Sequence, residues 1–381
     1  METGTLLTLG DGLRLEEGAC LPLRSHFGQC RACEKACPAH VLSVSIDGVA
    51  LAPGCLGCGR CVSACPTDAL ELEGFELPAA LPAGAGAVEL ECFKVPASAN
   101  AEAIRVPCLG ALSPGRLAEL TERAGARGLV LVDRGWCGTC SAGCGATHPA
   151  KAALDVLALW LDAIGAPDRK PRLQSRPLPA AAMPEAIPHT RRDPNEQPLS
   201  RRDFFRRLAE NPTGRPRDVS PMGASGRAAF PATGRHQSRE RRRLVDALDA
   251  AAARAGTALP AELFPRVTNN GACADHRVCT AACPTGALKA RADAQGARLE
   301  FAGEACIACG ACTRACPEGA LVLEAHGGAR APAVIATHAQ RTCEACGDAF
   351  APRGDEALCA TCAKSQRFIR DAMSQLYRAR S

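Results

Sequence analysis

The sequence predicts a multidomain α+β protein assembled from several small, cysteine-rich units. The first observation is that the 24 cysteines of the 381-residue chain fall into four groups, at residues 20–65, 92–144, 273–316 and 343–362. The second is that short apolar strands alternate with helical segments between residues 88 and 165. The third is that aromatic residues make up only 3% of the chain, so we expect bound metal to replace part of an ordinary core.

The first unit covers residues 1–75 and holds two cysteine runs. The second run has the spacing C-x2-C-x2-C-x3-C-P, which is typical of the ligands of bacterial-type [4Fe–4S] clusters. In the first run, Phe27 stands where the first of four cysteines is expected, so we predict that Cys20 supplies the missing ligand. The last cysteine of each run binds the cluster of the other run. Cluster A is therefore expected on Cys20, Cys30, Cys33 and Cys65, and cluster B on Cys37, Cys55, Cys58 and Cys61.

Residues 88–165 are predicted to form a small α/β unit with some parallel strand pairing. The expected strands are Val88–Phe93, Ile104–Pro107 and Gly128–Val132, and the expected helices are Pro114–Ala124, which Ser113 can cap, and Pro149–Ile164.

The five cysteines of this central unit lie where strands end. Cys92 and Cys108 lie at the ends of two of the strands, whereas Cys137, Cys140 and Cys144 lie in a glycine-rich loop after the third. Thiols that converge on one sheet edge are well placed to hold a cluster. The alternative, that they are buried apolar side chains, suits Cys108 best.

Residues 166–236 are rich in proline and arginine and have little apolar periodicity, so they are predicted to be a flexible linker or a partner-docking segment. Within them, LSRRDFF at residues 199–205 resembles a twin-arginine export motif but has no apolar stretch after it. We therefore expect a basic docking segment there.

A short helix with a basic start is predicted over residues 237–256.

Residues 262–326 repeat the pattern of the first unit, with one histidine at a cysteine position. Cluster D is expected on Cys283, Cys306, Cys309 and Cys312. Cluster C is expected on Cys273, Cys279 and Cys316, with His276 as the fourth ligand. In Rieske centres, imidazole ligands raise the potential of the cluster. The alternative is that His276 faces solvent and that cluster C is a three-iron cluster or absent.

The C-terminal cysteines form two C-x2-C pairs within residues 340–363, namely Cys343, Cys346, Cys359 and Cys362. This spacing predicts a closed, tetrahedral four-thiolate site for a structural Zn2+ ion, as in zinc ribbons. A rubredoxin-type iron centre is the alternative. A last helix is predicted over residues 364–381.

Two resemblances add to this interpretation. The phrases CPAHVL, CPTDAL, CPTGAL and CPEGAL, together with the cysteine spacings, resemble the two-cluster bacterial ferredoxin family. This implies two ferredoxin-like modules and three or four [4Fe–4S] clusters. The phrases ECFK, IRVPCLGALSPGRL and GARGLVLVDRGWCGTC resemble the small iron–sulfur subunit of methyl-viologen-reducing hydrogenase and heterodisulfide reductase systems. That resemblance implies a [2Fe–2S] cluster on Cys92, Cys108 and two loop cysteines, although the loop spacing is narrower than expected.

These motifs indicate a multi-cluster electron-transfer protein. We expect it to be an electron-transfer subunit of an oxidoreductase rather than a stand-alone enzyme. The resemblances imply redox protein partners, such as subunits of a formate dehydrogenase, a hydrogenase or a heterodisulfide-reductase-like complex. Two alternatives stay open: a reductase with a catalytic central cluster, and a maturation or scaffold factor with structural clusters. A net charge of +5 is too small to favour nucleic acid. No apolar run approaches the roughly 18 residues of a membrane span, and metal-binding thiols favour the cytoplasm.

Overall fold

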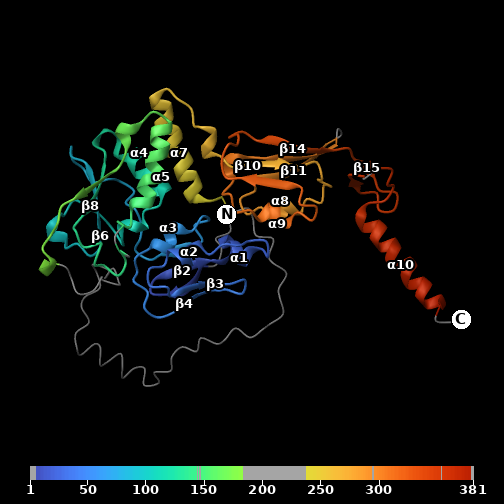
Figure 1. The fold of residues 1–381 in the computed structure, drawn as a ribbon, viewed down its shortest axis with the longest axis horizontal. Helices are drawn as coiled ribbons and strands as arrows, with labels where there is room; N and C mark the ends of the chain where they lie inside the picture. Colours follow the sequence, from blue (N-terminus) through green and yellow to red (C-terminus); the bar gives the residue numbers. More distant parts are fainter. Residues whose placement is uncertain are drawn as a thin grey trace, which may run out of the picture.

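The computed structural model describes residues 6–182 apart from 144 and 146, and residues 237–293, 296–352 and 354–378. The LSRRDFF segment and most of the predicted linker lie outside these ranges. The described chain forms two small cysteine-rich modules, an α/β unit beside them, and a hairpin with a C-terminal helix (Figure 1). Among the described residues, no helix combines the length and the apolar character needed to cross a membrane.

The first module consists of two small antiparallel sheets and short helices. In β2, Leu13 and Leu15 are each 1% exposed, whereas Arg14 and Glu16 alternate outward. One sheet contains β1 (Leu6–Gly10), β2 (Leu13–Glu16) and β5 (Leu70–Leu72), and the other β3 (Leu42–Val44) and β4 (Val49–Leu51). The helices are η1 (Glu17–Ala19), α1 (Leu21–Arg24), α2 (Ala32–Ala36) and α3 (Arg60–Ala64).

The central unit is a parallel four-stranded sheet in the order β7-β6-β8-β9. Its strands are β6 (Val88–Cys92), β7 (Ile104–Val106), β8 (Leu129–Asp133) and β9 (Arg172–Ser175). Its helices are η2 (Ala97–Ala99), η3 (Leu109–Ala111), α4 (Pro114–Ala124), η4 (Gly125–Arg127), α5 (Lys151–Ala163), η5 (Pro167–Arg169) and η6 (Ala180–Ala182). The hydroxyl of Ser113 caps α4 by accepting from Arg116 N at 3.3 Å.

Strand β9 corrects the sequence analysis, which placed residues 166–182 in the linker. Its side chains are exposed along the whole strand, so it lacks the apolar alternation by which strands are recognised. Backbone pairing with the buried strand β8 defines it instead.

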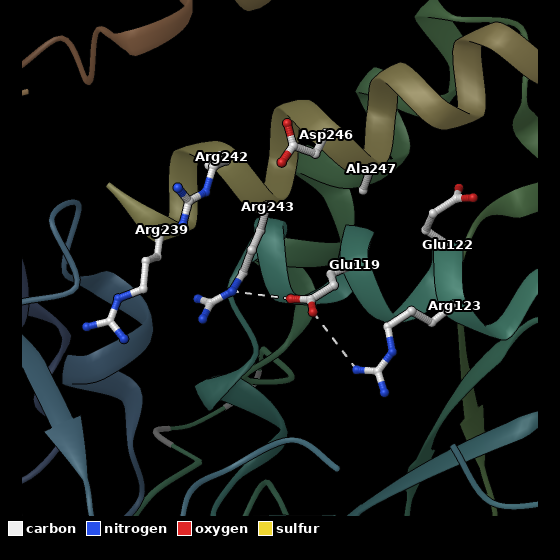
Figure 2. A pocket seen from close by; sticks show the side chains of 8 residues that line it. All are labelled: Glu119, Glu122, Arg123, Arg239, Arg242, Arg243, Asp246 and Ala247. Atoms are coloured by element: carbon white, nitrogen blue, oxygen red, sulfur yellow. Dashed lines mark ion pairs between the residues drawn. The ribbon is translucent and has the colours of Figure 1, made fainter. Parts of the chain in front are cut away.

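Helix α7 (Arg239–Ala255) packs on α4 and completes the core of the central unit with Val245 and Leu248. Its first turn approaches α4 closely, because Glu240 Oε1 accepts from Gly115 N at 2.6 Å and leaves no room for a Cβ atom on Gly115. Figure 2 shows the groove between the two helices, where Arg243 and Arg123 are both directed at Glu119. The predicted short helix is therefore an integral part of the central unit.

The second module repeats the plan of the first and extends further than the predicted end at residue 326. Strand β14 (Ala333–His338) pairs with β12, so the sheet order is β11-β12-β14. The other elements are η7 (Ala261–Leu263), β10 (Arg266–Asn269), α8 (Val278–Ala282), β11 (Leu288–Asp293), β12 (Gly296–Phe301), η8 (Gly303–Ala305), α9 (Ala311–Ala315) and β13 (Leu321–Glu324).

The C-terminal unit is a short hairpin followed by a long helix that extends away from the second module (Figure 1). The hairpin pairs β15 (Arg341–Thr342) with β16 (Ala349–Phe350). Helix α10 (Ala360–Arg378) begins before Cys362, so its first turn supplies one of the four thiols. Phe368 and Ile369 on this helix are 74% and 60% exposed.

Candidate metal centres

A proline after the last cysteine of each run determines where that cysteine points. Four five-residue helices, α2, α3, α8 and α9, end at these positions. The ψ angles lie between 112° and 115° at Cys37, Cys65, Cys283 and Cys316. A following proline disfavours helical backbone in the residue before it. Each of these cysteines therefore leaves its helix in extended conformation and joins the thiols of the other run.

Group A, defined as the thiols assigned to cluster A, lines one apolar cavity with side chains of β2, β3, β4 and β5. Its members are Cys20, Cys30, Cys33 and Cys65. Phe27, at the position of the missing cysteine, is instead 36% exposed. Burial raises the pKa of both Cys20 and Cys33 to about 12, so thiolates at this site require a cation beside them. The structure thus places Cys20 where the predicted fourth ligand is needed.

Group B lines a second cavity, walled by leucines of the same four strands. Its members are Cys37, Cys55, Cys58 and Cys61. Gly57 N lies 3.5 Å from Cys55 Sγ, and a positive φ of 58° at Gly57 turns that N–H inward. Burial raises the pKa of Cys61, and the nearby thiols that add to this effect include Cys33 of group A. The two groups are therefore electrostatic neighbours.

The second module contains two corresponding groups. The pKa of Cys312 is raised to about 12, first by burial and then by the nearby thiols of group D, which are Cys283, Cys306 and Cys309. The pKa of Cys279 is raised to about 11 by burial and by Cys273 and Cys316, the other thiols of group C. Backbone N–H groups donate to thiol sulfurs in both, from Ala308 to Cys306 at 3.4 Å and from Ala320 to Cys316 at 3.3 Å.

His276 has the backbone setting of a ligand. In the complete runs, the second cysteine (Cys58 or Cys309) stands between two residues of left-handed backbone. His276 stands likewise between Asp275 at φ 54° and Arg277 at φ 59°. Left-handed backbone is uncommon for residues other than glycine. The loop therefore keeps the ligand conformation even though the cysteine is replaced.

The side chain of His276 contacts a carboxylate. Its Nε2 atom lies 2.7 Å from Glu318 Oε1, and the two side chains are 36% and 23% exposed. Glu318 follows the Cys316-Pro317 pair, so this contact lies at the rim of group C. Ligation by His276 stays a prediction, and Glu318 is a polar partner that sequence analysis did not anticipate.

The central unit brings four thiols together at the carboxyl edge of its sheet. The pKa of Cys137 is raised to about 12, first by burial and then by Asp133 and three thiols, Cys108, Cys92 and Cys140. Gly110 N donates to Cys108 Sγ at 3.4 Å. Cys144 lies outside the described residues, so the structure shows Cys137 and Cys140 as the loop thiols that join Cys92 and Cys108.

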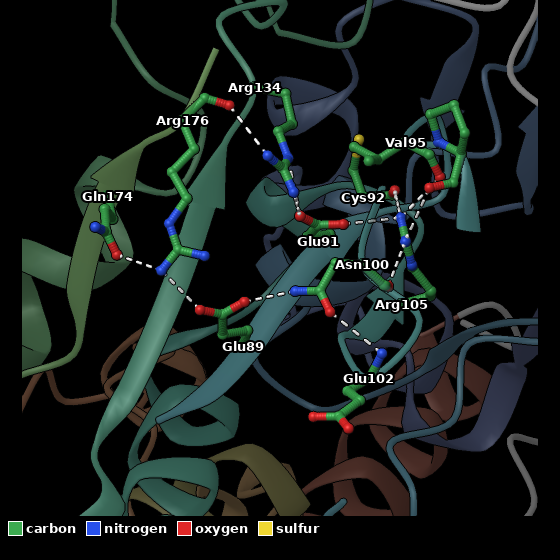
Figure 3. A network of polar contacts seen from close by, with 11 residues as sticks. Glu89, Glu91, Cys92, Val95, Asn100, Glu102, Arg105, Arg134, Gln174 and Arg176 are labelled. Carbon is green, nitrogen blue, oxygen red and sulfur yellow. Dashed lines mark hydrogen bonds and ion pairs between the residues drawn. The ribbon is translucent and has the colours of Figure 1, made fainter. Parts of the chain in front are cut away.

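A buried carboxylate connects the segments that carry these thiols (Figure 3). Glu91 on β6 is 0% exposed and forms ion pairs with Arg105 on β7, at 3.1 Å, and with Arg134 after β8. Arg105 also donates to the backbone oxygen of Val95 at 2.7 Å. Glu91 directly precedes Cys92 in the sequence. Arg105 and Arg134 each stand three residues before a thiol, Cys108 and Cys137 respectively. They were not predicted from the sequence, where the only signal was the two carboxylates, Glu89 and Glu91, within the strand VELEC.

Asp133, Cys137 and His148 also place potential ligand atoms within 4.8 Å of one another. The Nδ1 atom of His148 accepts a hydrogen bond from Ala150 N at 3.2 Å. In a neutral imidazole this leaves the proton on Nε2, and burial lowers the pKa of His148, which favours that neutral form. A protonated Nε2 offers no lone pair to a metal, so we assign no additional ion to this trio.

Group B and the central group are in direct contact. Cys58 and Cys108 pack in one buried apolar cluster with Ala142, and Cys140 lies against it. Arg60 donates to Ala142 O at 3.0 Å across the same boundary. The thiol side chains of two groups from different units therefore touch at the boundary between those units.

The C-terminal thiols form a tighter site than the other groups. The Sγ atoms of Cys343, Cys346, Cys359 and Cys362 all lie within 4.8 Å of one another, as ligands of a single tetrahedral ion do. The N–H of Cys359 donates to Cys343 Sγ at 3.2 Å, and this bond, together with further hydrogen bonds from Cys346 and Ala345, lowers the pKa of that thiol to about 6. A thiolate is therefore favoured at Cys343 before any ion binds.

Comparison with known families agrees with the two modules. Residues 28–75 match the LdpA Fe-S cluster-binding domain, and residues 272–321 match the 4Fe-4S dicluster domain. No curated protein matches the chain. The first match begins after Cys20, which the structure adds to group A.

The thiol groups fit the clusters that these families bind. Four cysteines converge in each of groups A, B and D, backbone N–H groups point at several of their sulfurs, and burial disfavours thiolates without a metal. The protein is an iron–sulfur electron-transfer protein of mixed helix and strand architecture, with an Fe-S cluster-binding domain in the first module and a 4Fe-4S dicluster domain in the second.

Proposed function

We propose that this chain is a relay subunit that carries single electrons between two redox proteins. When bound, the clusters supply one-electron chemistry at each cysteine group. The residues of the chain hold them, exclude water with leucine and valine side chains, and direct N–H groups at the sulfurs.

The packing of Cys58 against Cys108 is the observation that carries this proposal. A structural cluster needs no neighbour, because its metal stabilises only the unit that binds it. Here the ligands of two separate units touch, and groups A and B and groups C and D are neighbours within their modules. This arrangement suits transfer from one cluster to the next.

The partners we propose are subunits of a formate dehydrogenase, a hydrogenase or a heterodisulfide-reductase-like complex. The resemblance of the central unit to the small iron–sulfur subunit of such systems supports this choice. The same resemblance supports a [2Fe–2S] cluster on Cys92, Cys108 and two of the three loop cysteines, Cys137, Cys140 and Cys144. We further propose that the C-terminal thiols hold Zn2+ as a structural ion, because four sulfurs within 4.8 Å leave no open position.

The test uses the full chain, purified without oxygen. Iron and sulfide assays should give about 16 irons for four [4Fe–4S] clusters, about two more for a [2Fe–2S] centre, and about one zinc. The reduced protein should pass its electrons to a one-electron acceptor in successive steps, observed by EPR, while its iron content stays constant. Iron near zero, loss of iron to an apo-ferredoxin, or turnover of a small substrate by the chain alone would each contradict the relay.

A further inference from the structure

The two modules meet through the loops that carry their cysteines, although more than 200 residues separate them in the sequence. Figure 1 shows the first module directly below the second, with α1 near α9. The loop with Phe27, between Cys20 and Cys30, faces the helix that carries Cys312. Group A and group D therefore lie on the two sides of this contact.

Arg314 on α9 crosses the contact from the second module. Its Nε atom donates to Phe27 O at 2.8 Å, and its NH2 atom donates to Cys309 O at 2.8 Å. One guanidinium thus joins the backbone of a group D ligand to the loop of group A by two hydrogen bonds. Hydrogen-bonded connections of this kind couple redox centres better than an equal width of solvent.

Arg24 on α1 approaches from the first module. Its NH1 atom donates to Gly18 O at 3.0 Å, so the side chain folds back over the turn that holds Cys20. The same guanidinium is partly desolvated, which lowers its pKa, and the charge of Cys283 opposes this effect. Arg24 therefore lies on the turn of group A, near enough to Cys283 of group D for the two charges to interact.

We propose that Arg24 and Arg314 form a positively charged bridge between clusters A and D, which makes the chain one continuous relay. The order is central group, B, A, D and C. With clusters bound by the thiols of groups A and D, one electron would pass from cluster A to cluster D at the bridge, with no bond formed or broken and no proton moved. The donor is the redox protein of the proposed function, on which this inference rests.

The bridge has an electrostatic consequence that can be measured. Each cluster gains one negative charge on reduction, and a desolvated positive charge nearby stabilises that reduced state. Because Arg24 lies on the turn that holds Cys20 and its charge interacts with Cys283, we expect it to raise the midpoint potentials of both clusters. The solvent-exposed Arg31, which follows Cys30 and pairs with Glu34 at 2.8 Å, is screened by water and has little such effect.

The experiment is an EPR-monitored redox titration of the full chain carrying Arg24→Gln, Arg24→Lys, Arg314→Gln or the control Arg31→Gln. Cys20→Ala and Cys283→Ala variants identify the signals of clusters A and D. Arg24→Gln should lower both of these midpoints and leave the others unchanged, whereas Arg24→Lys should restore them and Arg31→Gln should resemble the wild type. Arg314→Gln should slow the filling of cluster D from cluster A in freeze-quench samples.

The outcomes separate the bridge from the proposed function. If the wild-type protein contains no iron–sulfur clusters, the relay itself is wrong. If the clusters are present and iron content is equal in all variants, but Arg24→Gln shifts neither or only one of the two midpoints, the bridge is overturned. An equal shift in Arg31→Gln would also overturn it, because the effect would then be one of net charge.

Discussion

Replacing Glu91 with glutamine should destabilise the central unit strongly. The change leaves the guanidinium groups of Arg105 and Arg134, which are 21% and 10% exposed, without their carboxylate. Removing one partner of a buried ion pair costs about 3–5 kcal/mol. Because both arginines keep some contact with water, we expect the lower end, about 3 kcal/mol.

Glu89, two residues earlier on the same strand, provides a matched control. It pairs with Arg176 at 2.7 Å, but the arginine is 38% exposed and the glutamate 19%. Partly exposed pairs of this kind contribute about 0–1 kcal/mol. Glu89→Gln should therefore have at most a third of the effect of Glu91→Gln.

Tryptophan fluorescence can follow this unit within the full chain. The chain has two tryptophans, and both Trp136 and Trp160 lie in the central unit. With a urea dependence of about 2 kcal/mol per molar, Glu91→Gln should lower the unfolding midpoint by about 1.5 M and Glu89→Gln by at most about 0.5 M. Equal midpoints for the two variants, at unchanged slope, would refute the role assigned to Glu91.

Three further predictions concern the metal sites. Cys20→Ala should remove cluster A alone or convert it to a three-iron cluster with its own EPR signal, and an unchanged spectrum would assign the fourth ligand elsewhere. His276→Cys should lower one midpoint potential, because thiolate adds negative charge where imidazole is neutral. Unchanged midpoints in both His276→Cys and His276→Ala would leave His276 as a surface partner of Glu318. Cys346→Ala should release about one zinc per chain at constant iron, and a loss of iron instead would indicate a rubredoxin-type centre.

Local spacing is enough to propose the thiol groups, because a C-x2-C-x2-C run and its proline act over a few residues. Even Cys20, ten residues before its run, could be assigned since no other upstream thiol exists in the first module. The elements that were missed depend on long-range contacts. Strand β9 has no apolar face, and the packing of α7 on α4 joins segments on either side of the linker. The pairing of Glu91 with two arginines likewise requires three strands to be in place.

The distribution of buried cysteines shows which units depend on metal. The core of the central unit is formed by aliphatic side chains and phenylalanines, and its buried members in the described chain include no cysteine. The buried core of the first module includes Cys20 and Cys65, and that of the second includes Cys279, Cys283 and Cys312.

Where thiols replace aliphatic side chains, the free energy of cluster binding is also folding free energy. Removal of iron should then unfold the two modules, while the central unit keeps a cooperative urea transition in tryptophan fluorescence. The central unit would remain folded but lose its contact with Cys58, and with it the connection to the rest of the relay. In the two modules, stability and electron transfer would therefore both depend on the same sulfur atoms. In the central unit, stability depends on aliphatic side chains, and only electron transfer would depend on sulfur atoms.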